Sequence, residues 1–126
     1  MPAMTIQALG HKFVELCNQG KNFDVMEMMY APDIVSVENS GEETAGKGPV
    51  IQKSRHWAEV NTFHGEKLRG PFFCGGTDSD GQFPVYFTLD ITRKSTGQRL
   101  TLEEVALYTV KNDKITREQF FYDGDH

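Results

Sequence analysis

Two glutamates stand where the hydrophobic pattern would place a carboxylate inside the protein. Glu38 ends the half-apolar segment 34–38, and Glu104 shares an alternating pattern with Leu102 and Tyr108. Burial disfavours the charged form of a carboxyl group and raises its pKa toward the range useful for proton exchange at neutral pH. These residues are therefore the candidate catalytic carboxyl groups. For Glu38 we expect a pKa above the ~4.3 of a free glutamate, unless a cation lies nearby.

Each glutamate has an alternative interpretation. Glu38 would be a solvated acid if the polar segment 39–48 left it open to water. Glu104 lies opposite Phe87, among apolar groups, in one register of the two strands concerned. A register shifted by one residue would send Glu103 inward instead, because neighbouring strand residues point to opposite faces.

Helical and strand periodicities predict the elements that position these glutamates. Apolar residues recur at helical spacing in three segments, 5–20, 22–31 and 49–64. Alternation and turn signals predict strands at 34–38, 66–74, 83–93, 99–110 and 115–122. Thr5 is suited to cap the first helix. The order of three helices followed by an antiparallel meander is typical of an α+β fold, which we expect to be one domain over residues 1–126.

The strongest alternation identifies the inner face of the sheet. Phe87, Leu89 and Ile91 alternate with polar residues, so they should face the helices. We expect this wall to pack against Phe13 and Leu16 of the first helix. A largely apolar pocket should remain between the sheet and that helix.

Composition and motifs exclude several other functions. The formal net charge is -5 with no basic stripe, which argues against nucleic-acid binding. No apolar run approaches the roughly 20 residues that span a bilayer, and no signal sequence is recognisable, so we expect a cytoplasmic protein without a membrane partner. Cys17 and Cys74 match no metal or redox spacing and should be buried thiols. His56 and His64 lack ligand partners, and no nucleotide or phosphate motif occurs, so no metal and no cofactor are expected.

The order of motifs resembles the SnoaL-like and ketosteroid-isomerase-like proteins of the nuclear-transport-factor-two-like superfamily. The matching features are a helix with an Asn-x-Gly break in 13–24, a Pro-Asp turn in 30–33, a strand ending in a carboxylate in 34–41, and the closing segments 108–115 and 120–123. The resemblance implies a cone-shaped barrel, in which a curved antiparallel sheet wraps around the N-terminal helices. It also implies that Glu38 is a proton-abstracting base.

Two positions depart from the ketosteroid isomerases. The tyrosine that stabilises the enolate oxygen in those enzymes falls on Phe13, and the partner acid falls on or near Ala106. Neither side chain can donate a hydrogen bond. Steroid isomerisation by that mechanism is therefore not expected, although Glu104, one pleat away from Ala106, could supply a displaced carboxylic acid.

The sequence leaves two alternatives for which side chains of the last strand point inward. Family spacing points Glu118, Phe120 and Tyr122 inward, whereas a two-residue turn at 112–113 would turn the opposite set, Arg117, Gln119 and Phe121, inward. We favour the first arrangement. It adds Glu118 and Tyr122 to the pocket.

The resemblance and the pattern together predict an enzyme that needs no cofactor. It would use the carboxylates Glu38 and Glu104 to isomerise, cyclise or dehydrate a small apolar or carbonyl-containing molecule. The predicted substrate-binding residues are Phe13, Trp57, Phe87, Leu89, Tyr108, Glu118 and Tyr122. For Trp57, plain core packing is the alternative to pocket lining. A non-catalytic ligand-binding or dimerisation domain of the same fold is the alternative for the whole chain.

A homodimer is also expected. Sheets of this family pair through their outer faces, and Tyr86, Thr88, Thr92, Thr109 and either Phe120 or Phe121 would leave such a face apolar.

Overall fold

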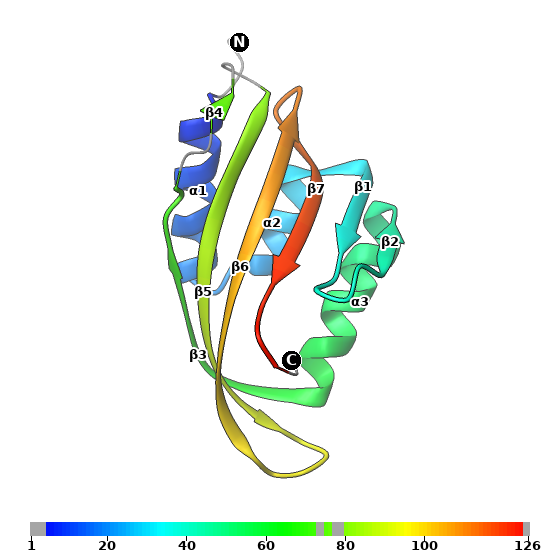
Figure 1. The fold of residues 1–126 in the computed structure, drawn as a ribbon, viewed down its shortest axis with the longest axis vertical. Coiled ribbons are helices and arrows are strands. Elements are labelled where there is room, and N and C mark those ends of the chain that lie inside the picture. Colours follow the sequence, from blue (N-terminus) through cyan, green and yellow to red (C-terminus); the bar gives the residue numbers. More distant parts are fainter. Residues whose placement is uncertain (1–4, 73–74, 77–79, 125–126) are drawn as a thin grey trace.

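The computed structural model describes residues 5–72, 75–76 and 80–124. Three helices and seven strands are assigned in these ranges (Figure 1). The helices are α1 (Ile6–Asn18), α2 (Asn22–Met29) and α3 (Lys47–Val60). The strands are β1 (Tyr30–Val37), β2 (Glu43–Ala45), β3 (Asn61–Arg69), β4 (Gly75–Gly76), β5 (Gly81–Arg93), β6 (Arg99–Lys111) and β7 (Lys114–Phe121).

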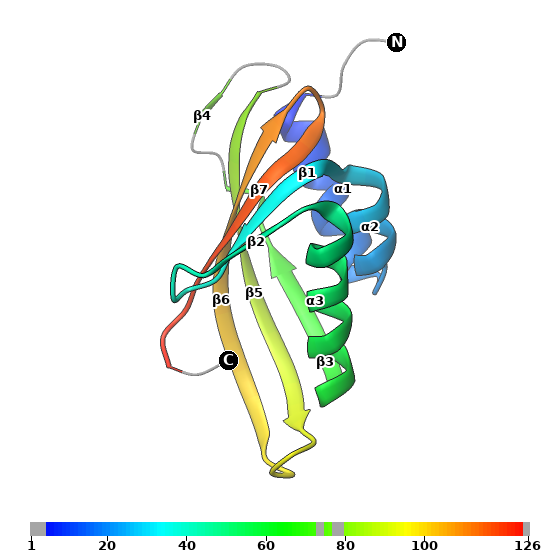
Figure 2. The same cartoon turned by 90° about the vertical axis from the view of Figure 1, so that its right-hand side faces the viewer.

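The strands form one curved sheet that remains open. Its order is β2-β1-β7-β6-β5-β3, and β4 pairs with β5 outside this path. The predicted meander of the later strands is confirmed, since β3, β5, β6 and β7 are neighbours in antiparallel pairs. The sheet is mixed rather than wholly antiparallel, because β1 runs parallel to β7. All three helices cover one face of the sheet (Figure 2), so the α+β class is as expected.

The first helix follows its predicted pattern. Thr5 caps it, since the side chain accepts a hydrogen bond of 3.0 Å from the amide of Ala8. Its apolar stripe, spaced at three and four residues, is buried, as shown by Ile6, Leu9, Phe13 and Leu16.

The third helix is displaced from its predicted range. It begins at Lys47, so that Pro49 lies in its first turn, and it ends at Val60 rather than near His64. Asn61 is already extended, and its side-chain amide donates to the carbonyl oxygen of Trp57 at 3.0 Å. That bond satisfies one of the carbonyl groups that a helix end leaves unpaired.

The strands on either side of this helix also differ from prediction. β1 begins at Tyr30, four residues before the predicted start, and ends one residue before Glu38. The segment predicted as a loop contains β2. β3 ends at Arg69 and is followed by Gly70, whose φ of 121° favours glycine and departs from strand geometry. The predicted extension to residue 74 is therefore wrong as far as residue 72, and residues 73–74 lie outside the described residues.

The register of β5 and β6 is the one that turns Glu104 inward. Leu89 pairs with Leu102 and Phe87 pairs with Glu104. Glu103 is exposed. The alternative register with Glu103 inside is therefore excluded.

One prediction about the core is wrong. Phe87 joins the cluster that contains Phe13 and Leu16, but Leu89 and Ile91 belong to a separate cluster with Leu102. Trp57 of α3 packs on that second cluster. The reason is the difference in rise per residue between a strand and a helix. β5 and α1 both have 13 residues, but a strand rises about 3.3 Å per residue and a helix about 1.5 Å, so β5 extends beyond α1 and its far end lies beneath α3.

The last strand combines both alternatives. A two-residue turn at Asn112 and Asp113, both with positive φ, joins β6 to β7 as the short connection requires. A register shift between Thr109 and Val110 then displaces the pairing by one residue, so that Tyr108 lies opposite Glu118. The bulge therefore puts Glu118 on the inner face despite the two-residue turn.

Candidate active site

A cavity of about 690 Å³ lies between the helices and the inner face of the sheet. Its lining includes all nine residues predicted from the sequence, which are Phe13, Glu38, Trp57, Phe87, Leu89, Glu104, Tyr108, Glu118 and Tyr122. A volume of this size suits a small organic ligand. Helices α1 and α3, strands β5, β6 and β7, and the residues that directly follow β1 and β7 bring these side chains together from distant parts of the chain.

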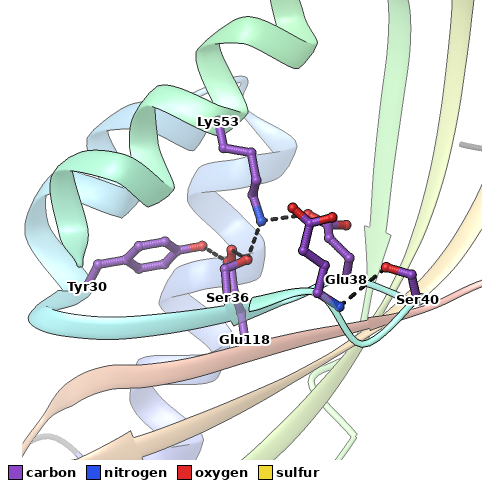
Figure 3. Close-up of polar contacts among 7 residues, drawn as sticks. Tyr30, Ser36, Glu38, Ser40, Lys53 and Glu118 are labelled. Atoms are coloured by element: carbon purple, nitrogen blue, oxygen red, sulfur yellow. Dashed lines mark hydrogen bonds and ion pairs between the residues drawn. The ribbon is translucent and has the colours of Figure 1, made fainter. Parts of the chain in front are cut away.

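Glu38 lies at one end of the cavity in an ion pair. Its Oε1 is 2.6 Å from Nζ of Lys53, and both side chains are about 30% exposed, at 31% and 30% respectively. Lys53 comes from α3, which packs over β1 (Figure 3). The sequence predicted a raised pKa for Glu38 only on condition that no cation lay nearby. Lys53 is such a cation, so this condition is not met.

Lys53 also connects Glu38 to a buried carboxylate. Its Nζ donates to Oγ of Ser36 at 2.6 Å, and that hydroxyl donates to Oε2 of Glu118 at 2.7 Å. The hydroxyl of Tyr30 donates to the other oxygen, Oε1 (Figure 3). Both oxygens of Glu118 are thus used by protein hydroxyls, although the sequence predicted a substrate-binding residue.

Glu118 is only 2% exposed. Burial raises the pKa of its carboxyl group, and the hydrogen bonds from Tyr30 and Ser36 and the charge of Lys53 oppose that rise. Burial and the nearby Glu118 also raise the pKa of Tyr30, so its hydroxyl keeps the proton that it donates. The group is a compensated buried acid rather than an open binding site.

Glu104 has a different environment on the wall formed by β6. Burial among apolar neighbours, with smaller contributions from the negative charges of Glu38, Glu118 and Glu66, raises its pKa to about 7. Both the protonated and the ionised form are then populated at neutral pH. Glu104 can therefore donate or accept a proton under physiological conditions.

Glu66 is a further carboxylate of the cavity that the sequence did not single out. It lines the cavity from β3 and accepts a hydrogen bond of 2.8 Å from the side-chain amide of Asn22. Burial raises its pKa, and the bond from Asn22 opposes that rise. Its signal in the sequence was a spacing of two from Leu68, which puts both on one face of a strand.

Lys53, Ser36 and Tyr30 were missed as well. Lys53 lies three residues after Val50 and four before Trp57, two apolar residues that share one face of a helix, so helical spacing could have identified it. Ser36 precedes Glu38 by two residues and shares its side of the chain. No comparable signal pointed to the hydroxyl of Tyr30.

Aromatic rings form much of the remaining wall. Phe13 packs against Tyr108 with ring centroids 4.5 Å apart, and Trp57 meets Phe63 edge-on at 5.2 Å. Trp57 lines the cavity and also packs on the cluster of Leu89, so both interpretations of this residue hold. The walls can thus enclose a flat apolar molecule between carboxylates.

Among the described residues, no group of three or more His, Cys, Asp or Glu side chains is arranged to hold a metal ion. The thiol of Cys17 is buried, and burial together with the charge of Glu66 raises its pKa to about 12, which leaves it protonated. Cys74 lies outside the described residues. None of the described helices is both long and apolar enough to cross a membrane.

Solved structures with the same fold include one whose sequence is similar over its whole length. A proposed SnoaL-like polyketide cyclase from Mesorhizobium loti, also given the name carbohydrate phosphatase, is 42% identical, with a TM-score of 0.87 over 94% of this chain and 100% of that chain. A proposed polyketide cyclase from Pseudomonas putida is 18% identical, with a TM-score of 0.75 over 96% and 93% of the two chains. A proposed hydroxylase from Streptomyces galilaeus is 16% identical, with a TM-score of 0.66 over 92% and 86%. The last two similarities establish the fold alone.

A comparison with family models agrees with the first of these structures. No curated protein matches the sequence. The model of the SnoaL-like domain matches residues 4–122, which is nearly the whole chain. With that match, and with 42% identity to a SnoaL-like protein along the full fold, the chain belongs to the SnoaL-like domain family.

Proposed function

We propose that this protein is an enzyme that moves a proton next to a carbonyl group of a small apolar molecule, as cyclases, isomerases and dehydratases do. One observation carries the proposal: the cavity contains two carboxylates in opposite electrostatic environments. Glu38 is bonded to Lys53, whereas burial, together with the negative charges of Glu38, Glu118 and Glu66, raises the pKa of Glu104 to about 7. Pairs of acids whose environments differ in this way can divide the roles of base and acid between them.

In the proposed reaction Glu38 is the base. It removes a proton from the carbon beside the carbonyl, and the electron pair moves to the carbonyl oxygen. Protonated Glu104 donates its proton, or a hydrogen bond, to that oxygen as the negative charge develops. The resulting enol then attacks a second carbonyl of the same molecule in a cyclisation, or takes a proton at another carbon in an isomerisation.

The charge of the cavity favours neutral substrates. Glu38, Glu66, Glu104 and Glu118 line it together with Lys53, which is already bonded to Glu38. A phosphate monoester would bring up to two negative charges into this partly desolvated space, where repulsion is strong. We therefore favour cyclase-type chemistry over a phosphatase activity, although both names are attached to the similar Mesorhizobium loti protein.

Deuterium exchange into an aryl ketone tests the proposal. In deuterium oxide, the protein should accelerate the exchange of deuterium into α-tetralone at the carbon beside the carbonyl. Proton NMR measures this exchange as the loss of the signal of that carbon's protons. Glu38→Gln keeps the shape but removes the base, so the rate should fall about 10²–10⁴-fold. Glu42→Gln, a matched change at an exposed loop carboxylate, should leave the rate unchanged.

Binding is measured separately. Trp57 is the single tryptophan of the chain and lines the cavity, so α-tetralone should quench its fluorescence in both the native protein and Glu38→Gln. Quenching without any accelerated exchange in the native protein would favour the non-catalytic binding domain instead.

The pH dependence assigns the second carboxylate. If Glu104 acts as the acid, its protonated form is required, so the exchange rate should fall as pH rises through about 7. Glu104→Gln should lower the rate and remove this fall, whereas Glu103→Gln on the exposed face should do neither. A rate that rises through pH 7 and loses this rise in Glu104→Gln would make Glu104 the base.

We also propose that the outer face of the sheet pairs with a second copy of the chain. Val105 and Phe121 are directly opposite each other on β6 and β7 and are 36% and 45% exposed, and Tyr86 pairs with Val105 on the other side. Light scattering should give about twice 14.2 kDa, and Val105→Lys should reduce that mass. A native mass near 14.2 kDa at micromolar concentration would contradict the dimer.

A further inference from the structure

We propose that Glu118 is a positioning residue for Glu38 and acts on it through Ser36 and Lys53. The inference rests on the proposed function, in which Glu38 is the base. It concerns a buried carboxylate that is bonded to two protein hydroxyls and acts through other side chains rather than on the reacting atoms.

The first link joins neighbouring strands. Ser36 and Glu118 are direct partners in the parallel pairing of β1 and β7, which puts both side chains on the same face of the sheet. The hydroxyl of Ser36 has one proton, and that proton is donated to Glu118 at 2.7 Å. The lone pairs of the same oxygen are thereby turned toward Lys53, from which they accept at 2.6 Å.

The second link fixes the base. Nζ of Lys53 is held at two points, by Ser36 and by Oε1 of Glu38, each at 2.6 Å. A lysine that makes a single exposed ion pair retains much of the freedom of its long side chain. Held at two points, Lys53 fixes one oxygen of Glu38 and thereby the direction in which the other oxygen points. A misplaced base costs rate because proton transfer requires hydrogen-bond distance to the substrate.

The burial of Glu118 agrees with a role in orientation rather than in stability. A buried carboxylate is costly to desolvate, and well-packed apolar groups usually stabilise a core at least as well. Glu118 remains 2% exposed and has two hydroxyl donors, of which Tyr30 fixes one oxygen and Ser36 the other. The two donors hold the carboxylate in one rotamer, as a rigid support for Ser36 requires.

Two substitutions that each remove one of these donors form a matched pair. Ser36→Ala and Tyr30→Phe both remove one buried hydroxyl bond to Glu118, but only Ser36 also contacts Lys53. A merely structural role for Glu118 predicts similar effects of both. A positioning role predicts that Ser36→Ala releases Lys53 and that Tyr30→Phe does not.

The first readout needs no substrate. In protein labelled with ¹⁵N-lysine, the ammonium protons of Lys53 should exchange slowly enough to give a resolved NMR signal, identified by its loss in Lys53→Arg. That signal should disappear in Ser36→Ala and in Glu118→Gln and remain in Tyr30→Phe. Persistence of the signal in Ser36→Ala, or its loss in all three variants alike, would overturn the inference.

The second readout is the α-tetralone exchange reaction. We expect Ser36→Ala to lower kcat about tenfold, with KM within twofold of the native value. The loss of kcat in Tyr30→Phe should be several-fold smaller than the loss in Ser36→Ala. Equal losses in the two variants would overturn the positioning role. If the native protein accelerates no exchange, the proposed function fails, while the lysine signal still decides whether Glu118 holds Lys53 in place.

Discussion

The inner face of the sheet has two regions that differ in what covers them. Beneath α1, Phe83 of β5 and Tyr108 of β6 pack with Phe13 into the larger apolar cluster, in which Phe83 and Leu68 lie away from the cavity that Phe13 and Tyr108 border. Beneath α3, the same two strands carry Glu104 and Leu89 on the wall of a cavity. The alternation along the strands is the same in both regions. The difference shows that the helices, rather than the strands, decide where the core closes and where ionisable groups can lie inside.

The largest effect should come from equal truncations in the two regions. Leu68 and Leu89 are similarly buried strand leucines, at 3% and 5% exposure, but Leu68 belongs to the larger apolar cluster and Leu89 borders the cavity. Leu68→Ala should destabilise the protein by about 4 kcal/mol, because it creates a new void, and Leu89→Ala by about 2 kcal/mol. Denaturant unfolding of both variants measures the difference. Equal losses would mean that the second region is closed in solution.

Glu104 gives the next effect, through pH. Its pKa of about 7 in the folded protein lies above the ordinary glutamate value of 4.5. The folded state therefore binds a proton more tightly than the unfolded state does, and this contribution is complete below pH 4.5 and is lost as pH rises through about 7. In the native protein this contribution should lower the unfolding free energy by up to about 3 kcal/mol between pH 5 and pH 8. Glu104→Gln should abolish that decline, which unfolding measurements at the two pH values test. Glu103→Gln is the matched control, and identical pH profiles of native protein and Glu104→Gln would show that Glu104 is solvated.

Lys53 gives a smaller effect that separates the two carboxylates. Lys53→Met removes the hydrogen bonds to Glu38 and Ser36 and the charge that opposes the negative charge of Glu118. Removing one partner of such charged hydrogen bonds should cost about 1–3 kcal/mol at pH 8. Lys47→Met removes an ion pair of 4.0 Å to a carboxylate that is 61% exposed and an exposed hydrogen bond to the carbonyl oxygen of Glu27, and should cost less than about 1 kcal/mol. Equal costs in chemical unfolding would indicate that Lys53 is solvated and leaves Glu38 mobile.

Much of this protein follows from sequence periodicity. The face of α1 and the alternation of β5 are local patterns, and each fixes which side chains turn inward whatever the neighbouring elements do. Glu104 was predictable for the same reason, since it lies two residues from buried neighbours on either side. The family resemblance likewise pointed to Glu38, which lines the cavity, because the order of helix, turn and strand is encoded along the chain.

Tertiary structure decided the remaining features. Which side of β7 faces inward depends on the register shift between Thr109 and Val110. That shift belongs to the pairing of β6 with β7, and no pattern within either strand specifies it. The position of Leu89 beneath α3 depends on the relative lengths of a strand and a helix. The partnership of Glu38 with Lys53, and of Lys53 with Ser36 and Glu118, depends on α3 packing over β1 and on β1 lying beside β7. Sequence therefore determined which residues face inward, and the packing of separate elements determined which of them meet, because contacts between elements depend on three-dimensional distances that no local period encodes.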